Sequence, residues 1–540
     1  MNVFAPDRAV RQRPRLILLA VCLAVLMVPV SLSGISVALP AIGQSLHAGI
    51  VPLQWSVNAY SVSAASFVLA TGSLADIVGR RRMFVAGTAL FGLSSLVCAL
   101  ATNIYLLDSA RALAGLGAAA IITAGTAVVA TTFQGPARNR AFAMTGVVVG
   151  AGLALGPTTS GWLIALMGWR GIFLSQLLIA VVVLCMVRVL PESHDVEAER
   201  VDWAGTSTFT SSLFVLTVAV AEGPQLGWTS PAMLGLVVVF ALLLAGFVLA
   251  ERRQDRPMFD LSLFTQPRFV ALCLLPVVFA FGFVGLVVLI PSYLIGANGE
   301  SSSTAGLTML LLTGPVLVVP LLAARLLQWG VSTRVLLAGS LLVTTLGVAW
   351  LTVIHPGIGW LVLLGPMLTV GIGQGLSSGL MDGAAVSSVE PSRAGMAAGM
   401  FNTMRLAGEA VAIAAMGGVL VSLIQGRLSH GIGAFSGQTS GTAHSLANKV
   451  ASGNISGPAA SVPGPHHAAF THFLSGGYTD AMHIMLWAIA AFCGVATVVV
   501  YVLLAERPAA RAVPPSDPDP DAAVVALPVE PEPEPEQVSR

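Results

Sequence analysis

Residues 16–38 read LILLAVCLAVLMVPVSLSGISVA, an apolar run that contains no charged side chain. The hydrocarbon core of a bilayer is about 30 Å thick and takes about 20 helical residues to cross, so this run has the length of a membrane-spanning helix. Similar runs continue along the chain and predict an all-α integral membrane protein with fourteen spans. The predicted spans are 16–38, 52–74, 83–101, 104–128, 141–164, 171–190, 205–221, 231–250, 269–293, 304–327, 335–354, 359–382, 397–424 and 480–504.

The composition agrees with a membrane location. Hydrophobic residues make up 56% of the 540 residues and charged residues only 9%, against roughly 25% charged residues in soluble domains. The formal net charge of +1 gives no reason to expect a nucleic-acid partner. The five cysteines lie within apolar runs and are expected to pack as small hydrophobic side chains. The first run is too long for a secretory signal, so no cleavable leader is expected.

Basic residues are concentrated on one side of the predicted bundle. Clusters such as Arg8–Arg15, Arg80–Arg82 and Arg252–Arg256 flank alternate spans, whereas the other side holds only a few basic residues, among them Arg427 and Lys449. Because basic loops tend to remain in the cytoplasm, we expect both termini to be cytoplasmic. The expected location is the inner (plasma) membrane of the cell.

Polar segments divide the spans into groups of six, two and six. The Pro- and acid-rich end of the chain cannot bury a core and is expected to be disordered. The expected parts are a cytoplasmic N-terminus at 1–15, an N-terminal six-helix half at 16–190, a linker at 191–204, two extra helices at 205–250, a second linker at 251–268, a C-terminal six-helix half at 269–504 with an outer loop at 425–478, and a cytoplasmic tail at 505–540.

The most specific motif follows the second predicted span. Residues 72–82 read GSLADIVGRRR and resemble the pattern G-x-L-a-D-r-x-G-r-k of the major facilitator superfamily, with Ile77 in place of a basic residue. The resemblance implies a transporter with the two-halved major-facilitator fold, and residues 330–339 (GVSTRVLLAG) resemble a second copy of the motif. An ordinary basic loop would explain the arginines but not the Gly-Asp-Gly spacing. The implied gate motif consists of Gly72, Leu74, Asp76, Gly79, Arg80 and Arg81.

The fourth predicted span contains a charged residue, Arg111. A cation at the centre of a membrane helix costs about 2.5–3.5 kcal/mol on insertion scales, so it should face a cavity or a partner. Residues 107–117 read LDSARALAGLG and resemble the superfamily's fourth-helix pattern l-x-x-x-R-x-x-q-G-x-g, with Ala114 in place of glutamine. The resemblance implies a role for Arg111 in proton transfer. A structural pair with Asp108, one helical turn away, is the alternative.

Residues 152–161 of the fifth predicted span read GLALGPTTSG and follow further glycines. They are similar to g-x-x-x-G-P-x-x-G-G, the motif of exporters that exchange substrate for protons. Small residues let helices approach closely and proline bends a helix, so plain small-residue packing is the alternative. SVALP at 36–40, DWAG at 202–205 and GMAAG at 395–399 are similar to the fourteen-helix drug:proton antiporters of the EmrB/QacA type. The implied antiporter motif consists of Gly146, Gly152, Gly156, Pro157 and Gly161.

Ser31 departs from this family, whose members commonly carry an aspartate at that position of the first helix. The remaining candidate for a coupling carboxylate is Glu409 in the thirteenth predicted span, four residues after Arg405. A carboxyl group within hydrocarbon can exchange a proton as its surroundings change. A static Arg405–Glu409 pair that stabilises the helix is the alternative. Asp382, near the cytoplasmic end of the twelfth span, is a further candidate for proton coupling.

Other patterns are better explained by packing or solvation. The GIGQG sequence at 371–375 lies inside an apolar span, so helix packing is expected there rather than nucleotide binding. The sequence contains no P-loop motif. His466, His467 and His472 lie in the predicted outer loop, and a solvated loop explains them better than a metal site.

The sequence therefore predicts a proton-driven exporter of amphipathic drugs, antibiotics or similar compounds, whose two halves open alternately to each side. Ser31, Gln374 and Asn402 are expected to line the substrate cavity. Because Ser31 is neutral, the preference for cationic substrates should be weak. The alternatives are a transporter of an endogenous metabolite or lipid, an uptake symporter of the same fold, and a transport-dead receptor or scaffold.

No enzymatic activity, metal or cofactor is expected, and the coupling ion is the proton. The expected partners are a small-molecule substrate and membrane lipids, without nucleic acid. The chain is expected to act as a monomer, and the sequence leaves a periplasmic adaptor open.

Overall fold

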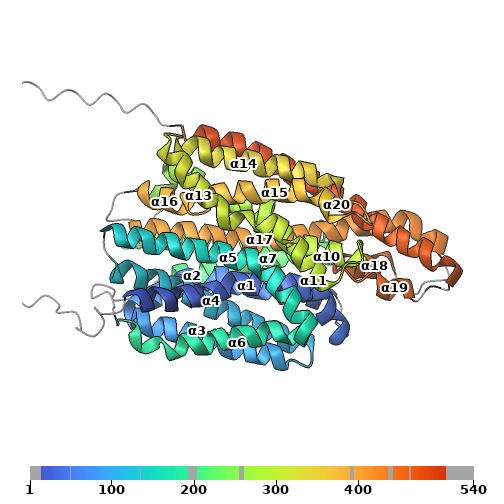
Figure 1. Ribbon diagram of the computed structural model, residues 1–540, viewed down its shortest axis with the longest axis horizontal. Helices are drawn as coiled ribbons and strands as arrows, with labels where there is room; N and C mark the ends of the chain where they lie inside the picture. The colour runs from blue at the N-terminus through green and yellow to red at the C-terminus, as the bar shows by residue number, and fades with distance from the viewer. Residues whose placement is uncertain are drawn as a thin grey trace, which may run out of the picture. The chain divides into compact units, whose positions relative to one another are not determined.

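The computed structural model describes residues 14–505 except 49, 134, 193–202, 255–260, 390–393, 436–441, 461 and 463. Within these described residues every element is a helix (Figure 1), and each predicted run overlaps one helix or a set of consecutive helices. Most of each predicted terminal segment lies outside the described residues, as do residues 193–202 of the first linker and 255–260 of the second. The described part of the second linker contains the end of α8 (Pro231–Arg253), a 3-10 helix η3 at Leu261–Thr265 and the start of α9 (Pro267–Phe279). The all-helical fold class is confirmed.

The first half consists of six helices. α2 pairs with α4, α3 packs between α4 and α6, and α1 runs along α5. Their bounds are α1 Pro14–Ser45, α2 Ile50–Val78, α3 Arg80–Leu100, α4 Ile104–Thr132, α5 Gly135–Met167 and α6 Arg170–Cys185, with a short 3-10 helix η2 at Val187–Val189.

The second half repeats this packing. α13 pairs with α15, α14 packs between α15 and α20, and α9 runs along α17, which is the pattern that a duplicated six-helix unit produces. Several spans are built from consecutive pieces. The bounds are α9 Pro267–Phe279, the π-helix η4 Ala280–Val284, α10 Gly285–Gly296, α11 Ser302–Thr308, α12 Leu310–Thr313, α13 Pro315–Gln328, α14 Thr333–Trp350, the 3-10 helix η5 Leu351–Val353, α15 Trp360–Ser377, α16 Leu380–Ser387, α17 Ala394–Gly431 and α20 Gly464–Leu503.

Twelve spans, rather than fourteen, have both the length and the mean hydropathy to cross a membrane within the described residues. The two predicted spans that do not qualify correspond to α2, which carries polar side chains such as Gln54 and Asn58, and to α6, which is 16 residues long. α2 nevertheless packs inside the bundle against α4 and α17. The chain is thus a multi-pass membrane protein, and the number of fourteen spans stays a prediction.

The two extra helices, α7 (Trp203–Leu226) and α8 (Pro231–Arg253), differ in their surroundings. α7 packs against α2 of the first half and α17 of the second. The Thr210 hydroxyl donates to the Ser66 carbonyl at 2.8 Å, and the Trp55 indole donates to Glu222 at 2.9 Å, so two hydrogen bonds tie α7 to α2. α8 packs on α7 and buries only 11% of its most apolar window, as expected of a helix that faces lipid.

The segment predicted as an outer loop at 425–478 is largely helical. α17 has 38 residues and α20 has 40, lengths of about 57 and 60 Å at 1.5 Å per residue, so both helices extend well beyond a 30 Å hydrocarbon core. Between them lie the 3-10 helix η7 Ile432–Phe435 and the helices α18 Ala443–Ala451 and α19 Ser456–Ala460. The buried side chains of Leu446 and Val450 on α18 supply the apolar contacts that let this segment fold.

Glycine allows α3 and α4 to touch backbone to backbone. A Cβ atom at Gly117 of α4 would lie 2.8 Å from both the carbonyl oxygen of Gly87 and the backbone nitrogen of Phe91 on α3. Contacts shorter than 3.0 Å leave no room for a methyl group, so helix separation at this crossing depends on glycine.

We predict that Gly117→Val lowers the free energy of unfolding by about 1–3 kcal/mol, the usual cost of an overpacked core. The measurement is the thermal unfolding midpoint of the detergent-purified protein. Gly235→Val on α8 is the control, because no atom lies within 4 Å of its added Cβ. Equal shifts in the two variants would contradict the packing argument.

A half-buried carboxylate lies in the loop between α10 and α11. Glu300 accepts hydrogen bonds from Asn298 at 2.9 Å and from Thr308 at 3.4 Å. Burial raises the pKa of the Glu300 carboxyl above its ordinary value, although both hydrogen bonds act in the opposite direction. The folded state therefore holds a proton on Glu300 more tightly than the unfolded chain does.

We predict that the wild-type protein loses stability relative to Glu300→Gln as the pH rises from the ordinary Glu pKa of about 4.3 through the raised pKa. The sign follows because in this window the folded state binds more protons than the unfolded state. Unfolding midpoints measured between pH 4 and 7 test this, with Asp480→Asn, an exposed carboxylate on α20, as the control. A wild-type protein that gains stability relative to Glu300→Gln as the pH rises would contradict the prediction.

Candidate functional site

Arg111 of α4 is the centre of a buried polar cluster in the first half. Its side chain is only 1% exposed. Nη1 donates to the Ser31 hydroxyl at 2.6 Å and Nε donates to the Ser56 carbonyl at 2.8 Å. The guanidinium carbon lies 4.2 Å from the ring centroid of Tyr60, and the Tyr60 hydroxyl donates to the Val28 carbonyl at 3.0 Å. The arginine therefore joins α1, α2 and α4.

The proposed ion pair between Arg111 and Asp108 is not formed among the described contacts. Asp108 instead accepts a 2.6 Å hydrogen bond from the Ser56 hydroxyl. Ser56 thus touches both charged residues, with its side chain on Asp108 and its carbonyl on Arg111. The direct partners of Arg111 in this part of the chain are neutral groups.

Ser31, predicted for the substrate cavity, is 3% exposed and holds Arg111 instead of lining open space. The position at which the family resemblance implies an aspartate is therefore the position that contacts the buried arginine. Sequence spacing alone could not show this contact, because 80 positions separate the two residues along the chain.

The charged residues of the second half are paired differently from the prediction. Arg405 on α17 forms an ion pair with Asp382 on α16 at 3.3 Å, and both side chains are partly exposed. Glu409 makes no hydrogen bond or ion pair within 4 Å among the described residues, although Arg405 interacts with it electrostatically. Glu409 lies within electrostatic reach of Tyr60, which places it near the Arg111 cluster of the first half.

The other predicted cavity residues of the second half lie on α15 and α17. Gln374 is 7% exposed, and its Oε1 atom has no hydrogen-bond partner among the described residues. Its Nε2 atom lies 3.5 Å from the Ser378 hydroxyl, a weak contact. Asn402 is half-buried and has a partner. Neither residue contacts the Arg111 cluster directly.

The predicted antiporter motif lies where α5 meets two other helices. Added Cβ atoms at Gly152 and Gly156 would collide with Pro29 and Ser33 of α1, so these glycines allow α5 to pack tightly within its half. At Gly161 an added Cβ would lie 2.5 Å from the Ser302 carbonyl of the second half. Gly146 has no neighbour within 4 Å of an added Cβ.

Pro157 of the same motif belongs to the contact between the two halves. An added Cβ at Gly306 of α11 would lie 2.7 Å from the Pro157 carbonyl. The adjacent Thr158 hydroxyl donates to the Gly306 carbonyl at 2.7 Å, and Thr313 donates to the Ala154 carbonyl at 2.7 Å. The halves therefore meet closely at the end where α5 finishes and α11 begins.

The predicted gate motif spans the end of α2 and the start of α3. Gly79 has φ 112°, a conformation that strongly favours glycine, and Gly330 in the equivalent loop of the second half has φ 89°. The side chain of Asp76 lies outside the described residues, and Arg80 has a partner. Arg82 lies 3.7 Å from Glu192, just after η2, a partner that the motif did not predict.

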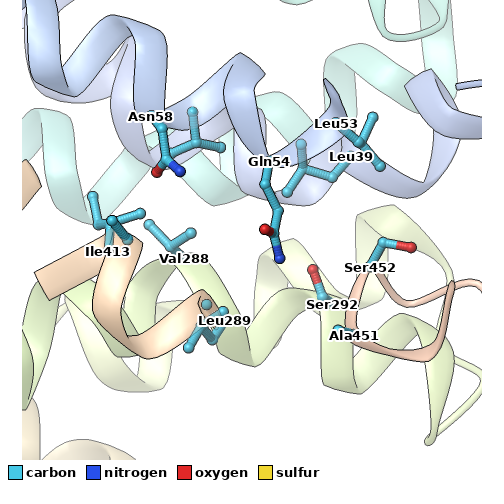
Figure 2. A pocket seen from close by; sticks show the side chains of 13 residues that line it. Leu39, Leu53, Gln54, Asn58, Val288, Leu289, Ser292, Ile413, Ala451 and Ser452 are labelled. Carbon is cyan, nitrogen blue, oxygen red and sulfur yellow. The ribbon is translucent and has the colours of Figure 1, made fainter. Parts of the chain in front are cut away.

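A cavity lies between the halves near the end where they meet (Figure 2). Leu39 and Leu53 of the first half face Val288 and Ile413 of the second, so most of the wall is apolar. Figure 2 shows Gln54 and Asn58 on the α2 side of this cavity. These amides were not among the predicted site residues, although both stand out in an apolar segment. Ser292, Ala451 and Ser452 complete this region.

The glycines of the GIGQG segment pack against neighbouring helices. Gly371, Gly373 and Gly375 lie within α15 and contact Leu312, Thr344 and Val319 of neighbouring helices, which confirms their packing role. Among the described residues no group of three or more His, Cys, Asp or Glu side chains is placed to hold a metal ion. His467 bonds instead to the Ala459 carbonyl at 2.8 Å.

The fold and the buried charges define a multi-pass membrane transporter built from two six-helix halves. The chain belongs to the Major Facilitator Superfamily, whose family model matches residues 21–413. Members of this superfamily are transporters and not enzymes.

Curated relatives are similar over most of the chain. The multidrug resistance protein Stp of Mycobacterium tuberculosis is 34% identical over 76% of this chain and 77% of its own length. The drug efflux pump JefA of the same species is 30% identical over 76% and 81%. The cephamycin export protein CmcT of Amycolatopsis lactamdurans is 33% identical over 74% and 83%.

Solved structures share the fold at low sequence identity. An inward-facing, occupied bacterial homologue of the human lysosomal transporter Spinster matches with a TM-score of 0.58 and 15% identity, covering 90% of this chain and 96% of that one. The human organic anion transporter TETRAN matches with a TM-score of 0.53 and 16% identity, covering 88% and 100%. At these identities the likeness shows the fold alone.

We predict that Arg111→Lys lowers transport of ethidium about tenfold or more, since a buried hydrogen bond to a charged group contributes about 1.5–3 kcal/mol. A lysine has a single ammonium group and cannot reproduce the planar contacts to Ser31, Ser56 and the Tyr60 ring. Transport by membrane vesicles with matched protein amounts measures the effect. Arg334→Lys is the control, because Arg334 also stacks on a tyrosine, Tyr501, but away from this cluster. Similar losses in both variants would contradict the assignment.

Proposed function

We propose that the chain is a proton-driven efflux transporter of amphipathic drugs and antibiotics. The observation that carries this proposal is the similarity, over about three quarters of the chain, to proteins named for drug efflux and antibiotic export. The Gly-Pro contacts of α5, which join α1 and the second half, support the same function.

In the proposed orientation, the arginine-rich end of the bundle, where α2 finishes, faces the cytoplasm, because basic loops tend to remain there. Both termini then lie in the cytoplasm, and the long α17–α20 extension lies outside the plasma membrane. In this orientation the contact of Thr158 with Gly306 closes the outer end of the transporter. An exporter needs a closed outer end when it accepts substrate from the cytoplasm or the inner leaflet.

The cavity of Figure 2 supports a broad substrate range. Apolar side chains can contact many amphipathic molecules, whereas the amides of Gln54 and Asn58 supply a small number of hydrogen-bonding groups without charge. A wall of this kind does not select strongly for cations. The transporter acts as a monomer in contact with membrane lipids.

Glu409 is the proposed coupling carboxylate. It lies within a membrane helix, has no hydrogen-bond or ion-pair partner among the described residues, and is close enough to Tyr60 to interact electrostatically. A carboxyl group in this position can bind a proton in one state and release it in another, because no fixed partner holds its charge. Arg405, which is paired with Asp382, lies one turn earlier and adjusts that balance.

We predict that Glu409→Gln abolishes uncoupler-sensitive export of ethidium and chloramphenicol from an efflux-deficient bacterium. The glutamine keeps the size of the side chain but cannot exchange a proton. Asp480→Asn, which removes an exposed carboxylate of α20, should leave export unchanged. Export that survives in Glu409→Gln would make Glu409 a structural residue. No export of either compound by the wild type would favour an endogenous metabolite or lipid as substrate.

A further inference from the structure

Arg111 has no negative charge among its direct partners. Ser31 contributes a hydroxyl and a carbonyl, and Ser56 contributes a carbonyl. A buried cation without a counter-charge is destabilised by several kcal/mol, and a cation–π contact such as that with Tyr60 restores only about 0.5–2 kcal/mol. The charge of Arg111 therefore requires a carboxylate at slightly longer range.

Asp108 is the carboxylate that the fold places there. It lies one turn before Arg111 on α4 and accepts the 2.6 Å hydrogen bond of Ser56. The carbonyl of the same Ser56 accepts the 2.8 Å hydrogen bond of Arg111. One residue of α2 thus connects the two charges, so a change of charge on Asp108 acts on the position of Ser56 and on the electrostatic environment of Arg111.

Asp108 is also accessible from a particular side. It is half-buried, in contrast to the fully buried Arg111, and it lies near the start of α4. In the proposed orientation this helix starts at the outer surface. Water on the outer side can therefore deliver a proton to Asp108 without passing Arg111.

We propose that Asp108 is a proton-binding site for the outer side, which sets the charge balance of Arg111 and so makes transport depend on outer pH. The inference rests on the proposed function, because it uses the orientation and the proton-driven cycle. Without a proton, Asp108 supplies the negative charge that Arg111 lacks. A proton from outer water binds a carboxylate oxygen of Asp108 and removes that charge, and the same proton returns to outer water when the outer pH rises.

The other charged or titratable groups around this pair differ from Asp108 in burial or in charge. Tyr60 on α2 and Cys98 on α3 interact electrostatically with Arg111 and are fully buried. Arg170 of α6 donates to the Ala101 carbonyl in the loop before α4 and remains protonated, as arginine does in proteins. Asp108 is thus the half-buried carboxylate beside Arg111, and Glu409 of the second half is the other carboxylate within electrostatic reach of Tyr60.

Ser31 provides a second and independent way to test the charge balance. Its hydroxyl lies 2.6 Å from Nη1 of Arg111, so an aspartate introduced there would be in direct contact with the guanidinium. Such a carboxylate would replace the charge lost in Asp108→Asn. A residue with a merely structural role at position 108 would not be rescued by a charge on α1.

Everted membrane vesicles carry the outer side of the protein in their lumen and allow its pH to be set. The initial rate of ethidium uptake is measured at lumen pH values from 5 to 8, with the pH difference across the membrane held constant. Ethidium exchange without a gradient is measured in parallel to report on folding and binding. The variants are Asp108→Asn, Asp108→Glu, Ser31→Asp combined with Asp108→Asn, and the control Asp480→Asn.

We expect Asp108→Asn to keep exchange within about threefold of wild type, while its uptake rate under a proton gradient falls below half of the wild-type rate and no longer varies with lumen pH. Ser31→Asp in that background should recover at least half of the wild-type uptake rate, and Asp480→Asn should keep the wild-type pH profile. An unchanged pH profile in Asp108→Asn would overturn the proposal. Loss of exchange in both Asp108→Asn and Asp108→Glu would also overturn it, because Asp108 would then be structural.

Failure of the proposed function would be seen without any Asp108 variant. Wild-type vesicles that take up neither ethidium nor chloramphenicol under a proton gradient would refute proton-driven drug export. The proposed role of Asp108 depends on that function and would be refuted as well. Wild-type uptake with an unaltered Asp108→Asn profile would refute only the role of Asp108.

Discussion

A guanidinium buried inside a membrane bundle constrains the helices around it. Arg111 cannot lose its proton, and it cannot reach water from a side chain that is 1% exposed. The surrounding helices must therefore supply acceptors at fixed positions: Ser31 on α1, Ser56 on α2 and the ring face of Tyr60. These contacts require α4 to approach α2 closely, which Gly115 allows, because an added Cβ there would collide with the Tyr60 carbonyl of α2.

The two halves share a packing pattern but not a charge arrangement. The first half holds its cation among neutral acceptors, and the second half leaves Glu409 without a fixed partner while Arg405 is paired with Asp382. Arg405 of its own helix and Tyr60 of the first half both interact electrostatically with Glu409. The charges of the two halves are therefore arranged differently although their helices pack alike.

The fold could be predicted from sequence because its determinants are local. Apolar runs of membrane length, and a Gly-Pro motif that packs α5 on α1, depend on residues that are close together in the chain. The site could be predicted only in part. Arg111 stands out as a charge in an apolar run, but its contact with Ser31 depends on the register between α1 and α4. The alternative pair of Arg405 with Glu409 follows from their local spacing of four residues, whereas the ion pair that forms joins Arg405 to Asp382, 23 positions away.

The motif of α5 shows why the contact between the halves can be both close and reversible. Gly152 and Gly156 pack on α1, so they fix α5 within its own half. On the same stretch of α5, the Thr158 hydroxyl donates to the Gly306 carbonyl, and the Thr313 hydroxyl of the second half donates to the Ala154 carbonyl. A hydroxyl that releases such a carbonyl can turn to a carbonyl of its own helix, as Thr313 already does with Met309 at 2.9 Å. Separation of the halves at this contact therefore need not leave a hydrogen-bond donor unsatisfied. This lowers the free energy needed to separate them, because an unpaired polar group in a membrane is strongly destabilising.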